Sequence, residues 1–537
     1  MKQNKSIDRR QFISRVAIGS GVLLAGLPAL SAYGCSRPAG ITSGYDPESF
    51  EADVEIDLTA APDETQIFPG RKTEVWRYTA RVRKGPASTV QNLPGTFTGP
   101  VFRFRKGDRV KIYFHNELPD KTVVHWHGLH VPQEADGHPR YVIGNGKTYV
   151  YAFEVMNRAG TYWFHPHPHG QTGPQVYRGL AGLFLITDDE EEALGLPAGN
   201  QEIPVVIQDR IFDNNNQLVY LRSRMDRMTG FLGNRILVNG QPDALLSLAP
   251  GTYRFRVLNG SNSRIYKLAW ADGTPLTVIG TDGGLLEAPV RKQYIMLGPA
   301  ERVDLWVDLA DRKAGEQLTL KSLPFSGGSM SGMMGGGMMG GGMMGRGNRN
   351  SSNVPDNGDE LTLLKIRIKT GMAKTGELSA KLSTIQRYDP AEAVNKNNPR
   401  AFHFTMQGMN PVINGRTFQM TKVARDEIVR LDTTEIWRLI NDNTGMMGNM
   451  MQMPHPVHIH GLSFLVLNRT KPATGWDTIK EGFVDQGWKD TVLLMPGMKA
   501  DVIMRFEDFP GLFLYHCHNL EHEDLGMMRN YLVQTKK

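Results

Sequence analysis

Apolar and polar residues alternate along many short stretches of this chain. Residues 101–105 read V-F-R-F-R and residues 109–114 read R-V-K-I-Y-F, on either side of a turn at Lys106-Gly107-Asp108. Residues 511–515, G-L-F-L-Y, indicate another extended segment. A period of two is typical of β-strands. Together with 58 Gly and 31 Pro residues, the pattern predicts an all-β protein whose strands are joined by turns.

The chain of 537 residues is long enough for about three domains. Strand-like sequence patterns predict domains at 47–190, 200–370 and 382–537. The middle domain contains no histidine, which favours an architectural or interface role for it. Within it, residues 326–358 form a Gly- and Met-rich insertion that cannot build a core, because ordering it costs entropy that little burial offsets. We expect this insertion to be flexible.

The N-terminal residues 1–38 have the pattern of an export signal. Arg9-Arg10 precedes a weakly apolar, Gly-containing stretch, and this twin-arginine arrangement predicts export of a folded protein, to a periplasmic or similar location. A transmembrane anchor fits less well, because the apolar run is short and interrupted by Gly and Pro28. Cys35 is a candidate site of lipid attachment. Residues 1–38 carry +5 of the net charge of +6, so the near-neutral remainder indicates no nucleic-acid binding.

The segment from Tyr515 to Met527, Y-H-C-H-N-L-E-H-E-D-L-G-M, is the strongest chemical signal in the chain. A thiolate, imidazoles and a more distant thioether are the ligand types of a blue-copper electron-transfer site. On a strand, Cys517 would face one side while His516 and His518 face the other. One thiolate therefore serves one metal, and its two neighbours serve a second site behind it.

The chain also contains an internal repeat. Residues 159–167 (A-G-T-Y-W-F-H-P-H) resemble residues 510–518 (P-G-L-F-L-Y-H-C-H), and V-V-H-W-H-G-L at 123–129 resembles P-V-H-I-H-G-L at 456–462. The first and last domains therefore look like copies of one fold, and their paired histidines predict an interdomain site. Structural zinc would need four ligands and no distant Met, and a single available cysteine excludes an iron–sulfur cluster.

These motifs resemble those of the three-domain multicopper oxidases, in particular bacterial copper efflux oxidases and Met-rich, laccase-like metallo-oxidases. The resemblance implies three cupredoxin-like Greek-key β-barrel domains and four coppers. It assigns the type 1 copper to His455, Cys517 and His522, with Met527 as the axial ligand. It assigns the type 2 copper to His125 and His458, one type 3 copper to His127, His165 and His518, and the other to His167, His460 and His516. His169 is left over and is interpreted as a structural residue or as a neighbour of the ligands.

The resemblance also implies a reaction, in which electrons from a one-electron reductant reach O2 through Cys517 and its flanking histidines. Reduction of O2 to water consumes four protons, and Asp136 and Glu523 match acidic positions that serve oxygen chemistry in the copper efflux oxidases. Asp490 resembles the acid that holds a type 1 histidine in the family. Ordinary surface or strand-end roles remain the alternative for Asp136 and Glu523.

Methionines bear on the substrate, because thioethers are soft ligands that favour Cu(I). Candidate substrate-copper ligands are Met451 and Met453, just before His455, and in the insertion Met333, Met334, Met338, Met339, Met343 and Met344. Met451 stands where the efflux oxidases have Asp, so the detailed site departs from theirs. Core filling and a chemically inert loop are the alternatives.

The sequence therefore predicts a monomeric cuprous oxidase that uses O2 and serves copper tolerance, with laccase-type activity on phenols or aromatic amines. The alternatives are a general laccase whose Met-rich insertion only gates access, and a non-enzymatic copper-storage or cell-envelope scaffold on the same fold.

Overall fold

A computed structural model describes residues 45–93, 95–328, 354–408, 410–442 and 453–535. Among these residues, no helix is both long and apolar enough to span a membrane. The predicted export signal with Cys35, and seven candidate methionines, lie outside the described residues: Met333, Met334, Met338, Met339, Met343, Met344 and Met451.

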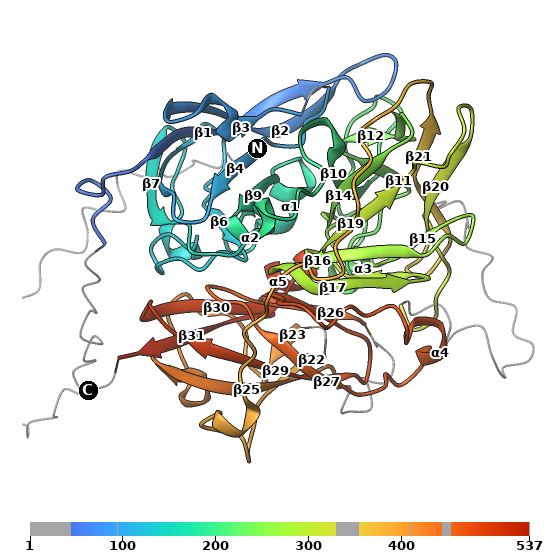
Figure 1. Cartoon of the computed structure of the whole chain (residues 1–537). Coiled ribbons are helices and arrows are strands. Elements are labelled where there is room, and N and C mark those ends of the chain that lie inside the picture. The colour runs from blue at the N-terminus through green and yellow to red at the C-terminus, as the bar shows by residue number, and fades with distance from the viewer. Residues whose placement is uncertain (1–44, 94, 329–353, 409, 443–452, 536–537) are drawn as a thin grey trace, which may run out of the picture. The chain divides into compact units, whose positions relative to one another are not determined.

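The first domain is built from two sheets (Figure 1). One contains, in spatial order, β2 (Thr73–Lys84), β1 (Val54–Thr65), β5 (Arg109–Asn116) and β7 (Lys147–Glu154). The other contains β3 (Val90–Gln91), β4 (Val101–Arg105), β9 (Gly182–Thr187), β8 (Gly160–Pro166) and β6 (Val124–His127). Aromatic side chains of alternate strand positions, such as Phe102, Trp126 and Phe164, are fully buried between the sheets.

The middle domain also has two sheets. Its larger sheet contains β12 (Gln241–Pro242), β11 (Arg235–Val238), β10 (Glu202–Arg210), β14 (Thr252–Asn259), β19 (Arg302–Asp308), β16 (Leu276–Thr281) and β17 (Gly284–Lys292). Its smaller sheet contains β13 (Leu245–Leu248), β21 (Leu361–Ile368), β20 (Gln317–Ser322), β15 (Tyr266–Trp270) and β18 (Ile295–Leu297).

The third domain repeats the plan. One sheet contains β23 (Asn410–Ile413), β22 (Arg400–Gln407), β25 (Thr433–Ile440), β29 (Lys499–Phe506) and β27 (Leu465–Arg469). The other contains β24 (Ile428–Arg430), β31 (Met528–Gln534), β30 (Gly511–Cys517), β26 (His455–Ile459) and β28 (Thr491–Leu494). The core of this domain includes Ile265, Met296 and Phe325 of the middle domain, so the two domains share apolar packing.

Helices are short throughout the described residues. The α-helices are α1 (Thr172–Tyr177), α2 (Asp189–Glu192), α3 (Arg224–Thr229), α4 (Trp476–Ile479) and α5 (Leu520–Asp524). The 3₁₀ helices are η2 (Ala87–Thr89), η3 (Pro139–Tyr141), η4 (Gly199–Gln201), η6 (Pro390–Glu392) and η7 (Arg425–Glu427). The prediction of an all-β protein is confirmed.

The same strand pairing recurs in all three domains. Each domain has one parallel pair in each sheet: β1–β5 and β4–β9, then β10–β14 and β13–β21, then β22–β25 and β24–β31. The histidine-bearing pair β6–β8 of the first domain matches β26–β30 of the third. In the middle domain β15 and β20 take the equivalent places without a histidine, so the repeated fold alone does not require the site.

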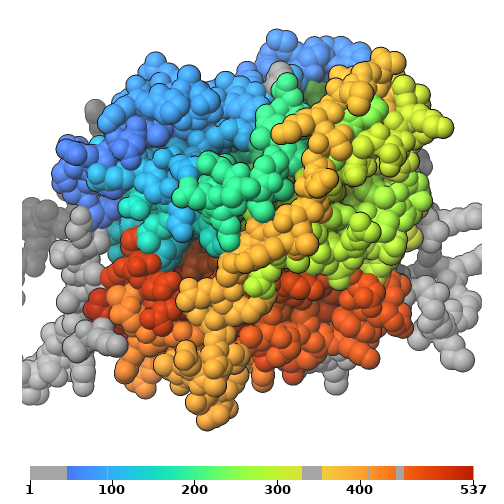
Figure 2. Space-filling model, viewed as in Figure 1, coloured from blue at the N-terminus to red at the C-terminus, as the bar shows by residue number. Residues whose placement is uncertain are grey.

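The connection from the middle domain to the third runs across the surface as an extended segment at 369–399 (Figure 2, yellow to orange). Ser383 donates its hydroxyl to the Leu285 and Leu286 carbonyls, and the Thr384 amide donates to Glu190 of the first domain at 2.8 Å. This segment therefore contacts two domains before it enters the third.

Candidate metal centre

The thiolate site lies where β30 and β26 pair side by side. Cys517 ends β30, and its backbone is in register with Val457 on β26. His455, two residues before Val457, points to the same face, and its Nδ1 lies 3.2 Å from the Cys517 Sγ. His522 approaches from α5, with its Nδ1 3.7 Å from the same sulfur. All three side chains are buried.

The turn after β30 brings Met527 back to this site. The Asn519 side chain caps α5 by accepting the His522 amide, which fixes the helix that carries His522. The Met527 amide donates to the His522 carbonyl at 2.9 Å, and the Cys517 amide donates to the Met527 carbonyl at 3.1 Å. Met527 is fully buried in the same apolar cluster as Cys517. Four candidate ligands thus come from one short stretch and one neighbouring strand.

The electrostatics of this site suit a soft cation. Burial raises the pKa of the Cys517 thiol, although the Asn519 amide donates toward the sulfur at 3.5 Å. Burial also lowers the pKa of His522 to about 4. A bound cation would reverse the first effect, since the thiolate and neutral imidazoles are the forms that ligate metals.

The second site lies on the other face of the same strands. On β30 and β26, His516 is directly opposite His458, and in the first domain His125 on β6 is directly opposite His165 on β8. Each of these four histidines is followed two residues later by another: His460 and His518 in the third domain, and His127 and His167 in the first. All eight imidazoles are buried, and they meet between the first and third domains.

The ring nitrogens of these eight histidines converge. The Nε2 atoms of His125 and His458 lie 3.2 Å apart, and the Nδ1 of His127 lies 3.3 Å from the Nε2 of His165. The Nε2 of His516 lies 3.1 Å from that of His460 and 3.4 Å from that of His167. Within 4.8 Å the potential ligand atoms form these groups: His127, His165 and His518; His167, His460 and His516; His125, His127 and His458; His125, Asp136 and His460; and, at the thiolate site, His455, Cys517 and His522.

Most of these rings are held by their outer nitrogen. The Nδ1 of His125 donates to the Asp136 carbonyl at 2.5 Å, and the Nδ1 of His165 donates to the Pro166 carbonyl at 2.9 Å. Such a bond fixes the tautomer and leaves the other nitrogen as a lone pair that faces the cluster. The site is therefore arranged to accept cations.

Several buried atoms at the cluster have no partner among the described residues. Both ring nitrogens of His518 and the Nδ1 of His167 make no hydrogen bond. Burial, followed by the neighbouring histidines, holds the pKa of His125 and of His518 well below the usual value, so the rings are neutral. Inward-facing lone pairs on neutral imidazoles fit Cu, and with the thiolate site they form a set that zinc would not need.

Asp136 and Glu523 both lie against the cluster. The Nδ1 of His460 donates to the Asp136 Oδ2 at 2.8 Å. The Glu523 Oε2 lies 3.2 Å from the Nδ1 of His516, and its Oε1 lies 3.5 Å from the Nε2 of His167. Burial raises the pKa of Asp136 well above its usual value, whereas at Glu523 the effect of burial is outweighed by His516 and His167, which hold its pKa well below the usual value. These carboxyl groups are thus in a position to exchange protons with anything bound at the cluster.

Comparison with known proteins identifies the family. Two models described as multicopper oxidase match residues 74–191 and 390–537. The multicopper oxidase mco of Staphylococcus aureus is 32% identical over 447 residues, which cover 83% of this chain and 84% of that protein. The chain belongs to the multicopper oxidase family. Membership implies copper, and the histidine and cysteine groups are compatible with it.

Solved structures support the same conclusion for the fold. The McoA multicopper oxidase of the hyperthermophile Aquifex aeolicus matches with a TM-score of 0.72 and 31% identity, over 90% of this chain and 97% of that one. The predicted cupredoxin-like domains are thereby confirmed. The cell division protein FtsP of Sodalis glossinidius is also similar, with 29% identity over 99% of both chains. Similarity over the whole chain therefore does not by itself decide what this multicopper oxidase acts on.

One prediction about the copper sites is wrong. Asp490 does not hold a type 1 histidine. Its Oδ1 accepts a hydrogen bond from the Nε2 of His127 at 3.1 Å, and its carbonyl accepts one from the Nδ1 of His458 at 2.8 Å. Asp490 precedes β28, and its fully buried side chain points to the cluster face, away from Cys517.

A residue that sequence reasoning missed covers His522 at the thiolate site. The Nε2 of His522 donates to the Met228 carbonyl at 3.0 Å, and Met228 belongs to α3 of the middle domain. The Met225 side chain, one turn earlier, is half exposed. The methionines of α3 were the available signal, since they stand close together in S-R-M-D-R-M-T. The domain without histidines therefore still reaches the thiolate site.

Two further residues complete the surroundings. Met453 is buried, and its carbonyl accepts a hydrogen bond from the Asn441 side chain at 2.8 Å. His169 is exposed against Phe418 and belongs to no group of convergent ligands among the described residues. Its interpretation as a residue outside the copper ligands fits this position.

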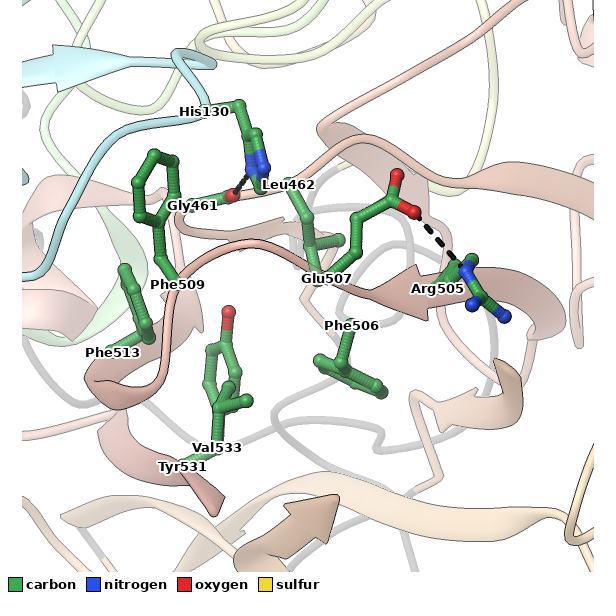
Figure 3. A pocket seen from close by; sticks show the side chains of 10 residues that line it. All are labelled: His130, Gly461, Leu462, Arg505, Phe506, Glu507, Phe509, Phe513, Tyr531 and Val533. Atoms are coloured by element: carbon green, nitrogen blue, oxygen red, sulfur yellow. Dashed lines mark hydrogen bonds and ion pairs between the residues drawn. The ribbon is translucent and has the colours of Figure 1, made fainter. Parts of the chain in front are cut away.

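The loops that follow the two H-x-H motifs are tied across the domain boundary. The Nδ1 of His130 donates to the Gly461 carbonyl at 2.6 Å, and its Nε2 lies 2.9 Å from the Asp508 Oδ2. Figure 3 shows His130 above a small apolar hollow lined by Phe513 and Tyr531. The Tyr531 hydroxyl donates to the His460 carbonyl at 2.7 Å. These bonds hold the backbone next to the ligand histidines.

Proposed function

We propose that this multicopper oxidase holds four coppers and couples one-electron oxidation of Cu(I) to four-electron reduction of O2 to water. The observation that carries the proposal is the convergence of ten buried histidines and Cys517 into groups of potential metal ligands, one of which contains the cysteine. The type 1 copper takes His455, Cys517, His522 and Met527, and the type 2 copper takes His125 and His458. The type 3 coppers take His127, His165 and His518, and His167, His460 and His516.

The roles of the residues follow from their positions. When bound, the coppers store the four electrons that O2 requires, so partially reduced oxygen need not be released. Cys517 lies between His516 and His518 in the chain, so the backbone of three consecutive residues joins the two sites. Asp136, whose pKa is raised by burial, supplies protons at the buried cluster, where water has little access, and the Glu523 carboxylate accepts and passes on protons there.

Cu(I) as the main reductant, and a role in copper tolerance, rest on soft-ligand chemistry. Residues 326–358 and 446–453 are rich in methionine, and the second segment runs into His455. The α3 cover over His522 supports a small reductant, because the Met228 carbonyl occupies the outer nitrogen of the imidazole. Laccase-type oxidation of phenols or aromatic amines is then a slower side activity.

A kinetic comparison tests this choice of substrate. Steady-state O2 consumption is measured with Cu(I) and with a phenol, for the full chain and for a variant that lacks residues 326–358. We expect the deletion to lower the Cu(I) rate and to leave the phenol rate unchanged or higher. An unchanged Cu(I) rate would refute the role of the insertion and favour the general laccase, in which the insertion only gates access.

A non-enzymatic scaffold is the third candidate, after the general laccase, and the similarity to a relative named as a cell division protein shows that the family name alone does not fix the function. The oxidase and the scaffold are distinguished by the absorption expected from the thiolate site. A type 1 site gives an intense blue absorption from its thiolate–copper bond. Copper-loaded protein without this band, and without O2 consumption, would support the scaffold.

We further propose that the protein is exported through the twin-arginine route and acts as a monomer. Arg9-Arg10 supports the route, and Cys35 supports a lipid anchor. Changing both arginines to lysine should retain the precursor in the cytoplasm. Cys35→Ser should release the exported protein from the membrane fraction if the anchor exists.

A further inference from the structure

Asp136 holds one histidine of each end domain. Its main-chain carbonyl accepts the Nδ1–H of His125, which belongs to the same domain. Its carboxylate accepts the Nδ1–H of His460, which belongs to the third domain. One residue of the first domain thus fixes a ligand tautomer on both sides of the domain boundary.

Asp490 does the same from the opposite side. Its main-chain carbonyl accepts the Nδ1–H of His458 within the third domain, and its carboxylate accepts the Nε2–H of His127 from the first. His125 and His458 hold equivalent places in the repeat, as do His127 and His460. The two aspartates therefore make equivalent contacts: each binds one histidine of its own domain through the main-chain carbonyl and one of the other domain through the carboxylate. They do so although Asp136 and Asp490 occupy different places in their motifs.

The two aspartates differ in one respect. Arg302 of the middle domain forks onto Asp490, with Nη1 2.7 Å from Oδ1 and Nη2 2.5 Å from Oδ2. Asp136 has no such partner among the described residues, and its Oδ1 makes no hydrogen bond there. A bidentate guanidinium fixes both the orientation and the charge of a carboxylate. The Asp490 carboxylate is thus held in one orientation by two bonds, whereas the Asp136 Oδ1 accepts no hydrogen bond from the described residues.

Arg302 also contacts all three domains. Its Nε donates to the Thr161 carbonyl on β8 at 2.9 Å, and its Nη2 donates to the Asp282 carbonyl in its own domain at 2.9 Å. Lys489 lies 3.0 Å from Asp282 and extends the network. The Arg302 side chain is fully buried. A buried guanidinium is stable only when its N–H groups donate to acceptors, and the acceptors of Arg302 lie directly behind the histidine cluster.

We propose that Arg302 is a positioning residue for the interdomain copper cluster, and that it acts through Asp490 on His127 and His458. This inference rests on the proposed function, because it takes those histidines as copper ligands. The middle domain then has a defined role at the cluster. The described residues of the middle domain supply no ligand, but Arg302 binds Asp490, and Asp490 orients the two ligands His127 and His458.

Removing Arg302 should affect the type 2 copper but not the type 1 copper. The type 2 ligands His125 and His458 come from different domains, so losing the clamp should lower affinity for copper at that site about 10- to 100-fold. The type 1 ligands all come from the third domain and do not contact Arg302 or Asp490, so the blue absorption should persist.

The test uses three copper-loaded variants of the full chain. Arg302→Met removes the clamp. Arg302→Met with Asp490→Leu replaces the buried pair by apolar side chains, which restores much of the stability that one unpaired buried charge costs. Arg256→Met is the matched control. Arg256 is equally buried and contacts Thr161 and Asp304, but no residue of the third domain among those described.

Copper content after dialysis against a chelator, the resonance signal of the type 2 copper and the melting temperature are measured together. We expect Arg302→Met and the double variant to lose type 2 copper, with the double variant melting higher, while Arg256→Met keeps all its copper. Recovery of type 2 copper in the double variant, or its loss in Arg256→Met, would show a merely structural role and overturn the inference. Wild-type protein with fewer than four coppers would instead refute the proposed function.

Discussion

The Nε2 atoms of His125 and His458 lie 3.2 Å apart, although 333 residues separate them in the chain. Each histidine stands on a strand of the same rank in its domain, and each donates its Nδ1–H to the carbonyl of an aspartate. The pair exists only because two copies of one fold face each other. The candidate ligands of the thiolate site all come from the third domain, whereas the histidine cluster needs both the first and the third. We therefore expect the two sites to respond differently to substitution.

Cys517→Ser should separate these responses. The serine hydroxyl is a poor substitute for the thiolate, so the blue absorption should disappear and turnover should fall to background. The loss in stability should be modest, about 1–3 kcal/mol for a buried hydroxyl. Visible absorption, O2 consumption and circular dichroism check the three parts. Near wild-type turnover in this variant would mean that electrons bypass Cys517.

Asp136→Asn and Glu523→Gln should slow the reaction of the cluster with O2 but not the entry of electrons. Loss of a positioned acid costs about 10²- to 10⁴-fold in rate. Stopped-flow bleaching of the blue band by substrate without O2 should therefore be unchanged, while steady-state O2 consumption falls. Asp501→Asn is the control, because this largely buried acid pairs with Arg438 and contacts no ligand histidine. Slowed bleaching would indicate damage to the type 1 site instead.

Gly128→Ala should damage the cluster through Asp490. Gly128 follows His127 with a φ of +87°, and a Cβ there would lie 2.3 Å from the Asp490 Oδ2. We expect loss of type 2 copper and a destabilisation beyond the roughly 1–3 kcal/mol of backbone strain. Gly107→Ala is a matched control, because Gly107 has a φ of +94° and open space around it. Equal losses in both variants would argue that strain alone is responsible.

The α3 cover over His522 gives a prediction about substrate size. Ser223 caps α3 by accepting the Asp226 amide, and Ser223→Ala should weaken the helix by about 1 kcal/mol. We expect anaerobic reduction of the type 1 copper by a phenol to become about fivefold faster, with little change for Cu(I). Asp389→Ala, which removes the cap of η6, is the control. A phenol rate that does not change would show that α3 does not limit access.

The sequence was most informative where the backbone period decides the outcome. Cys517 and its neighbours face opposite sides because successive strand residues must, and the repeat of H-x-H motifs implied facing copies. Asp490 was misassigned because it pairs with His127 of another domain, and no local pattern records how domains dock. Arg302 and Met228 were missed for the same reason. The only trace of Arg302 was a charged residue at the start of the apolar strand β19.

His138 gives a prediction of pH dependence at a histidine that is not itself assigned to copper. Its Nε2 donates to the Asn530 Oδ1 at 2.9 Å, and its Nδ1 accepts the Arg140 amide at 3.1 Å, so the neutral ring is satisfied on both sides. Burial lowers the pKa of His138 to about 3, against about 6.5 in the unfolded chain.

Between these two values the unfolded chain binds a proton that the folded protein does not. Stability therefore falls as pH falls from about 6.5 to 3, by about 1.4 kcal/mol per pH unit from this residue, and is fully present above pH 6.5. His138→Gln cannot take up that proton. The variant should melt below wild type at pH 7, because the fit of the imidazole is lost, and the difference should narrow at pH 5 and again at pH 4. Melting temperatures of the two apoproteins measure it, since copper release then contributes to neither. A difference that stays constant with pH would mean that the folded protein protonates His138 as readily as the unfolded chain does.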